Sequence, residues 1–148
     1  MTQNNVGGVG LKITLFASIT FPLGITITEL SKETDPFVVN NVPLTKSGVG
    51  INGDKYVWQT AEQILTELNI IPNTESDKNL KILSNANRKS KNKVAVLDDI
   101  TITVEYPNGE TVTFLDGNIT EGKIANGVSS DGKYPDGHYT FEFGNVIY

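Results

Sequence analysis

The chain has 148 residues and a mass of 16.1 kDa, a size that fits one domain able to bury roughly two thirds of its unfolded surface. It carries 17 acidic and 12 basic side chains, and this acidic balance argues against a surface that holds nucleic acid by neutralising its phosphates. The absence of cysteine excludes disulfides, thiolate metal sites and cysteine nucleophiles, so an intracellular origin is the simpler interpretation.

The start of the chain predicts neither an export signal nor a membrane span. Residues 1–10 are glycine-rich and polar, lack the basic and apolar regions of a signal peptide, and are expected to be flexible. No run of about 18 apolar residues occurs in the chain. Strands are predicted at residues 11–20 and 25–30, separated at 21–24 where proline and glycine interrupt the pattern. Residues 31–36 are polar and predict a loop.

The middle of the chain predicts short strands joined by turns. Weak strand candidates at residues 37–40 and 42–45 precede a turn-rich connector, SGVGINGD, and a strand at 55–59. Trp58 is the sole tryptophan, and a packing or interface role is favoured over a ligand platform, because Tyr56 is the one aromatic beside it at strand spacing. Residues 60–71 allow a helix or a strand, and the alternating pattern favours a strand at 63–71.

A helix is predicted over about residues 75–88. Thr74 and Asp77 have the spacing of a capping box, in which each side chain reaches backbone donors at the helix start. The apolar residues form one narrow stripe, so we expect the helix to pack against a sheet by one face. This stripe consists of Leu80, Leu83 and Ala86, with Ile82 beside them.

A basic run follows this helix, at Arg88, Lys89, Lys91 and Lys93. Its cations are placed to offset the negative end of the helix dipole, and a solvated linker is the favoured interpretation. A DNA or membrane patch is the less favoured alternative. A third possibility is contact with acidic residues of an adjacent subunit, which would make assembly depend on salt.

The stretch from residue 98 to 123 predicts a β-hairpin with a defined register. Apolar and polar residues alternate in its first arm, and Pro107 disfavours a two-residue turn, so the loop should be residues 107–109 with Gly109 left-handed. With this loop Val104 lies opposite Val112, and the apolar residues of both arms share one face.

Further strands are predicted at residues 119–128, with a bulge or twist at the glycines, and at 138–143, where Tyr139, Phe141 and Phe143 alternate with polar residues. The intervening SSDGKYPDG predicts a loop. The expected architecture is mainly β: an antiparallel β sandwich or partly closed barrel with one flanking helix.

The sequence offers little for chemistry. His138 is the only histidine, and no nucleophile elbow accompanies it, so a catalytic role is disfavoured. Asp131 and Asp136 lie in a glycine-rich segment whose spacing does not match a calcium loop, which favours a turn. We therefore expect no enzyme, no cofactor, and no catalytic, cofactor-binding or metal residues. An acidic-site hydrolase is the least favoured class of function.

Five segments together resemble the tail tube proteins of contractile-tailed bacteriophages, and they span most of the chain. They are FPLGITITEL with DPF, GINGDKYVW, LNIIPNTESDKNLKILSNANR, the hairpin, and HYTFEF. The resemblance implies a single tube-like domain over residues 1–148, assembled in the host bacterial cytoplasm into the virion. It implies stacked rings, with six subunits each, that form the inner tube through which DNA passes during genome ejection.

The resemblance also implies partners and surfaces. The partners are other copies of the chain and the tail sheath, baseplate and tail terminator proteins, with DNA passing through the lumen without specific binding. Residues 30–42 are candidates for ring stacking, the hairpin arms for the lumen, and the exposed helix face for the sheath. Without the basic run the charge is near −9, so an acidic bore could let DNA slide. The alternative is a small β-sandwich module that binds carbohydrate or peptide on a larger particle.

Overall fold

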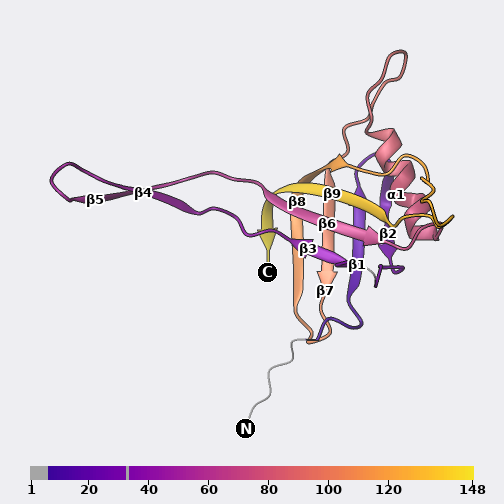
Figure 1. Cartoon of the computed structure of the whole chain (residues 1–148), viewed down its shortest axis with the longest axis horizontal. Helices are drawn as coiled ribbons and strands as arrows, with labels where there is room; N and C mark the ends of the chain where they lie inside the picture. The colour runs from indigo at the N-terminus through magenta and orange to yellow at the C-terminus, as the bar shows by residue number, and fades with distance from the viewer. Residues whose placement is uncertain (1–6, 33) are drawn as a thin grey trace, which may run out of the picture.

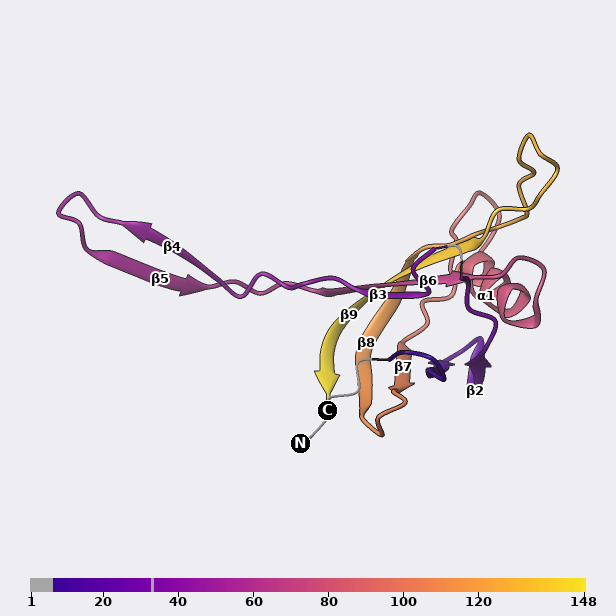
Figure 2. The same cartoon turned by 60° about the horizontal axis from the view of Figure 1, so that its bottom comes forward.

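The computed structural model describes residues 7–32 and 34–148. Its body is a single antiparallel sheet that curls into a half-barrel, with one helix beside it, and a long arm projects from the body (Figure 1). This confirms the predicted mainly-β class with one flanking helix. A second view shows the arm leaving the body at the side opposite the helix (Figure 2).

Seven strands form the body sheet in the order β2-β1-β7-β8-β9-β6-β3, and two form the arm. The body strands are β1 (Lys12–Ala17), β2 (Phe21–Ile27), β3 (Phe37–Val39), β6 (Ile64–Ile70), β7 (Ile100–Glu105), β8 (Thr111–Glu121) and β9 (Gly137–Ile147). The arm strands are β4 (Thr45–Val49) and β5 (Lys55–Gln59), and the helix is α1 (Glu75–Ala86).

One face of the body sheet carries the hydrophobic core. Alternate residues of β1, β7 and β9 are fully buried there, and Leu80 and Leu83 of α1 close the same core. Three phenylalanines form a continuous aromatic stack, with Phe143 at 5.4 Å from Phe114 and 6.2 Å from Phe141. Burying such rings supplies much of the driving force for folding. The opposite face of the sheet stays open.

The predicted hairpin register is confirmed. Val104 lies opposite Val112, Ile102 lies opposite Phe114, and the loop closes with Gly109 at φ +91°. The second arm, however, runs on as one long strand to Glu121. Asp116 takes φ +56° in a bulge between the two halves of β8, so the chain bends and keeps pairing with β9. The separate strand predicted at residues 119–128 is therefore wrong, since pairing ends at Glu121.

The first two strands are divided at a different place from the predicted one. The break lies at residues 18–20, not 21–24, and Phe21 to Gly24 belong to β2. The buried carboxylate of Asp98 accepts hydrogen bonds from the backbone N–H groups of Ile19 and Thr20 and stabilises this turn. Pro22 is tolerated because β2 is an edge strand, where a missing donor breaks no pairing.

The helix begins as predicted and ends two residues early. Thr74 is its N-cap and accepts from the Asp77 N–H, while the Asp77 carboxylate accepts from the Asn73 N–H rather than from the cap itself. At the other end Asn87 stops the helix, because its side chain donates to Leu83 O and to Asp98. The apolar stripe is narrower than predicted.

Ile82 is exposed, since α1 packs through Leu80 and Leu83.

Two further predictions concern the N-terminal segment and the connector before β5. Residues 1–6 of the segment predicted to be flexible lie outside the described residues, and Leu11 N donates to Gly8 O in a turn just after them. Residues 47–49, expected within a connector, belong to β4. In the part of the chain that the structure describes, no helix has the length and apolarity to cross a membrane.

Candidate functional site

The only histidine lies beside polar groups of β6. His138 Nδ1 lies 2.7 Å from Asn69 Oδ1 and 3.2 Å from Glu67 Oε1, with half of its side chain exposed. Asp136, close by in sequence, accepts from the hydroxyls of Ser31 and Thr34. These contacts tie the segment before β9 to the loop before β3. No group of three or more His, Cys, Asp or Glu suited to a metal ion occurs among residues 7–32 and 34–148.

The glycine-rich segment before β9 forms a turn around Asp131. Its carboxylate accepts from the Ser129 hydroxyl and from the Lys133 N–H at 3.0 Å, and the Gly132 N–H donates to Ser129 O. The Ser129 hydroxyl lowers the pKa of Asp131. These hydrogen bonds confirm the turn that the sequence predicted at this segment.

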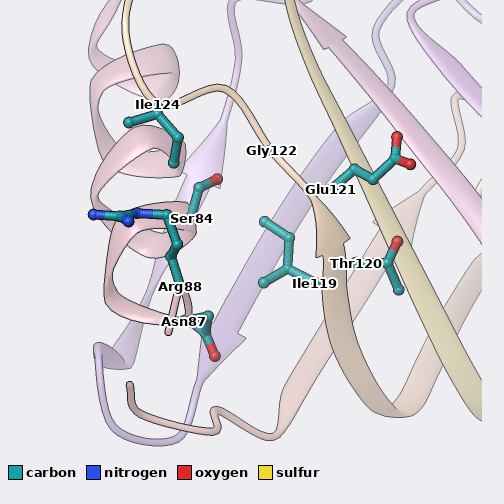
Figure 3. A pocket seen from close by; sticks show the side chains of 8 residues that line it. All are labelled: Ser84, Asn87, Arg88, Ile119, Thr120, Glu121, Gly122 and Ile124. Atoms are coloured by element: carbon teal, nitrogen blue, oxygen red, sulfur yellow. The ribbon is translucent and has the colours of Figure 1, made fainter. Parts of the chain in front are cut away.

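A cavity of about 490 Å³ lies between α1 and the end of β8 (Figure 3). Ser84 and Asn87 of the helix and Ile119 of β8 form its walls, and Gly122 passes so close that a Cβ there would clash with Ser84 Oγ. The charged residues do not converge: Arg88 contacts Asn85 Oδ1, and Figure 3 shows Arg88 and Glu121 pointing to opposite sides. The cavity brings no acid and base together.

Two buried carboxylates hold the helix to the sheet. Asp77, fully buried, contacts Lys123 Nζ at 2.9 Å and accepts from the Tyr139 hydroxyl at 2.9 Å. Burial first, and then the adjacent Asp77 charge, raises the pKa of Tyr139. At the other end of α1, burial of Asp98 raises its pKa, but hydrogen bonds from Thr20, Asn87 and Ile19 outweigh burial and the net pKa is lowered. Both sites are structural.

The basic run forms a tight turn after the helix. Lys93 Nζ donates to Asn85 O and Arg88 O, each at 2.5 Å, and so satisfies carbonyls at the helix C-terminus. This matches the favoured helix-dipole role for one of the four cations. Lys89 and Lys91 are exposed at the turn.

The projecting arm has no hydrophobic core of its own. No residue from 40 to 65 is buried, and β4 and β5 pair only with each other. Several large apolar side chains nevertheless lie on it: Leu44, Val49, Ile51, Tyr56, Val57 and Trp58. An isolated two-stranded hairpin is marginally stable in water at best, and clustered exposed apolar groups mark interaction sites. The arm is thus the strongest candidate functional element.

Trp58 and Tyr56 form an aromatic pair on the arm. Their rings stack at 5.7 Å with an interplanar angle of 19°, and Trp58 remains 45% exposed. The sequence predicted core or interface packing for Trp58, and the structure leaves its ring exposed on the arm. Residues 40–63 project from the body, which the sequence did not predict, whereas the assignment of residues 30–42 to ring stacking stays a prediction. The signal that was available is the turn at residues 50–54, where Gly53 has φ +85° and the Gly50 N–H donates to Asp54 O, so that β4 and β5 pair across it.

An apolar groove of about 350 Å³ lies on the body at the root of the arm. Its floor is Val112 and Phe114 of β8, its sides include Ile64 and Val42 at the two ends of the arm, and Glu110 stands at its rim. Val112 and Phe114 belong to the buried core and are only 7% and 4% exposed, and Ile64, Tyr106 and Val146 pack partly buried against the same core. The groove therefore borders the arm, whose strands β4 and β5 pair only with each other in the part of the chain that the structure describes.

The open face of the sheet is largely polar, although Phe16 and Leu65 are also exposed on it, and it carries few cations. Thr26, Thr14, Thr103 and Thr113 lie in register across four strands, and the last two hydroxyls are 3.5 Å apart. Lys12 is the only lysine or arginine in the seven body strands, and it lies opposite Glu105. Towards β6 the face carries the carboxylates of Glu67 and Glu142.

The chain has a half-barrel body, an uncovered sheet face and an arm that packs against no other element. These features define a β-rich structural module rather than a protein organised around a binding pocket. The family model described as tail fiber protein gp32 matches residues 4–147. The chain therefore belongs to the tail fiber protein gp32 family, and it is a structural protein of the bacteriophage tail and a component of the virion. No curated protein matches the chain.

Proposed function

We propose that this phage tail protein polymerises as stacked rings, with six subunits each, into the inner tube of a contractile tail. The tube conducts DNA during genome ejection, contacts the sheath, baseplate and terminator proteins, and performs no catalysis. The observation that carries the proposal is the arm: residues 40–63 expose a row of apolar side chains that nothing among residues 7–32 and 34–148 covers. A second chain is the natural cover for such a surface.

The sheet supports closure into a ring. The body sheet ends in the edge strand β2 on one side and in the three-residue strand β3 on the other. Pairing of such edges between copies would continue the sheet around a channel and leave no free edge. Pro22 limits this pairing on β2 to the residues after it.

The open face suits a channel for DNA. A wall of threonine hydroxyls and a few carboxylates, with Lys12 facing Glu105, offers phosphates little to bind. Since cation contacts supply most non-specific DNA affinity, this face would let a duplex slide. The helix then lies on the outer side, where its exposed face is available to the sheath.

Electron microscopy of the concentrated protein over a range of salt tests the proposal. Hollow rods or rings with a regular axial repeat are expected. The matched control replaces residues 44–60 with a short glycine-serine linker, which removes the arm and leaves the core strands intact. That variant should stay unassembled while keeping the β spectrum of the body. Wild-type protein that remains monomeric in every condition, even with tail baseplates added as nuclei, would contradict tube formation.

The second candidate is the small binding module for carbohydrate or peptide. The exposed Tyr56–Trp58 pair favours it, because aromatic faces are the surfaces on which sugars stack. The same experiment separates the two, since a module of this kind remains monomeric and its Trp58 emission responds to an added glycan. Tubes that form with no change in emission on glycan addition would favour the first candidate.

A further inference from the structure

We propose that the groove at the root of the arm receives the aromatic face of the arm of another copy of this chain. The inference rests on the proposed function and deepens it, because it names the surface to which the arm binds. The groove is defined by Val42, Ile64, Val112, Phe114 and Glu110. The aromatic face of the arm is defined by Tyr56 and Trp58 of β5 and Lys46 and Gly48 of β4.

The groove has the size and chemistry for an aromatic side chain. Its volume of about 350 Å³ exceeds what one indole needs, and its floor of Val112 and Phe114 is apolar. Phe114 is only 4% exposed and already packs edge-on against Phe37 at 6.3 Å, so an incoming ring would rest mainly on the partly exposed side chains of Val42, Ile64 and Val146. Glu110 has the one charged side chain among the residues that line it.

The arm presents a matching surface. In its register Trp58 lies opposite Lys46 and Tyr56 lies opposite Gly48, so these four residues share one face of the hairpin. Gly48 makes room for the Tyr56 ring, because a Cβ there would lie 2.5 Å from the Tyr56 hydroxyl. The face therefore combines two stacked rings with one cation, which complements an apolar groove with one carboxylate.

A chain cannot fill its own groove with its own aromatic face. Val42 and Ile64, which line the groove, are also the two ends of the arm, and both views show the β4–β5 hairpin far out from the body (Figures 1 and 2). Each copy thus offers the aromatic face of its arm and its groove at two different places on the molecule. Such head-to-tail contacts propagate from copy to copy, as a stacked assembly requires.

Charge exchange tests the pairing of Lys46 with Glu110. Lys46→Glu and Glu110→Lys should each raise the protein concentration at which assembly is half complete by at least tenfold at low salt. The double variant should restore it to within about threefold of wild type. Lys55→Glu is the matched control: it makes the same change on the opposite face of the hairpin, where Lys55 lies beside Val49, and should alter assembly less than threefold.

Disulfide trapping gives a second readout, since the chain has no cysteine of its own. Mild oxidation of the K46C/E110C variant should produce a ladder of covalent oligomers, and K55C/E110C should produce none. Assembled particles without a ladder, or equal effects of Lys46→Glu and Lys55→Glu, would overturn this inference while tube formation stands. Failure of the wild type to assemble at all would overturn the proposed function and this inference with it.

Discussion

The body and the arm are both built from antiparallel hairpins and reach opposite outcomes. In the body, alternating strands place Tyr139, Phe141 and Phe143 in a fully buried row. In the arm, alternation in β5 places Tyr56 and Trp58 on a face that stays exposed. The difference lies in what each hairpin meets, because strands β7 to β9 find a helix and more strands, whereas β4 and β5 find only each other.

This contrast shows that a strand pair stays exposed on both faces where no other described element packs against it. Substitutions in the body should therefore lower the free energy of unfolding, and substitutions in the arm should lower assembly alone. The following experiments test this division, from the largest expected loss of stability to the smallest.

Removing a core ring should have the largest effect. Phe143→Ala takes away a fully buried ring that stacks on Phe141 and Phe114 and covers Gly117 so closely that a Cβ at Gly117 would clash with it. We expect a loss of about 3–5 kcal/mol, from transfer and cavity terms together. Urea unfolding followed by circular dichroism measures it. A loss below about 1 kcal/mol would show that the half-barrel is not the stable unit.

Breaking the buried ion pair between Asp77 and Lys123 should cause the next largest loss of stability. Lys123→Met leaves the Asp77 carboxylate buried without its cation, although the Tyr139 hydroxyl still donates to it. The expected loss is about 3 kcal/mol. Lys78→Met is the control. Lys78 is exposed on α1, next to Asp77 in sequence, and its replacement should change the free energy of unfolding by less than about 0.5 kcal/mol.

Asp98 should make stability depend on pH. Because its folded pKa is lowered, its contribution is fully present above the unfolded pKa of about 3.9 and is lost as the pH falls through the folded value. Asp98→Asn should cost about 2 kcal/mol at pH 7, where hydrogen bonds to a charged group are lost. The gap between the two proteins should narrow at pH 3. A gap that is constant from pH 7 to pH 3 would contradict an ionised Asp98.

The turn of the β7–β8 hairpin should show a smaller effect. Gly109 has φ +91°, so Gly109→Val should cost about 1–2 kcal/mol and impair assembly. Gly109→Asn is the matched variant, since asparagine tolerates the left-handed region, and should lose less. Thermal unfolding of the three proteins compares them. Equal losses would mean that the turn relaxes to another conformation.

The arm should show almost no effect on stability. Trp58→Ala should change the free energy of unfolding by less than about 0.5 kcal/mol, because Trp58 contacts nothing in the body core, and should abolish tubes. As the sole tryptophan, Trp58 also reports on its own burial, and its emission should shift to the blue on assembly of the wild type. If the emission of Trp58 stays unchanged in assembled tubes, Trp58 does not lie at the interface.

Local chemistry made much of the fold predictable. The register of the β7–β8 hairpin follows from Pro107 and Gly109, and the start of α1 follows from Thr74, because turn and cap geometries depend on a few adjacent residues. The predictions failed where distant residues decide. Asp98, about 80 residues away, places the break between β1 and β2, and a bulge at Asp116 keeps β8 paired past its interruption.

The candidate site was only half predictable for the same reason. The sequence predicted a packing or interface role for Trp58 and noted Tyr56 as the one aromatic beside it at strand spacing, without deciding between the core and an interface. It did not show that residues 40–63 leave the body. Nothing in residues 45–59 distinguishes a hairpin that joins the main sheet from one that projects, because both need the same alternation and the same turn.

The sequence by itself determined the class of fold, the positions of most strands, the helix start and the hairpin register, all of which depend on short-range periodicity and turn geometry. Only the tertiary structure decided that the sheet curls into a half-barrel, that Asp77 and Asp98 hold α1 to it, and that the arm stands free beside an uncovered groove. These features depend on contacts between residues far apart in the chain, and no local pattern encodes which of the compatible contacts forms.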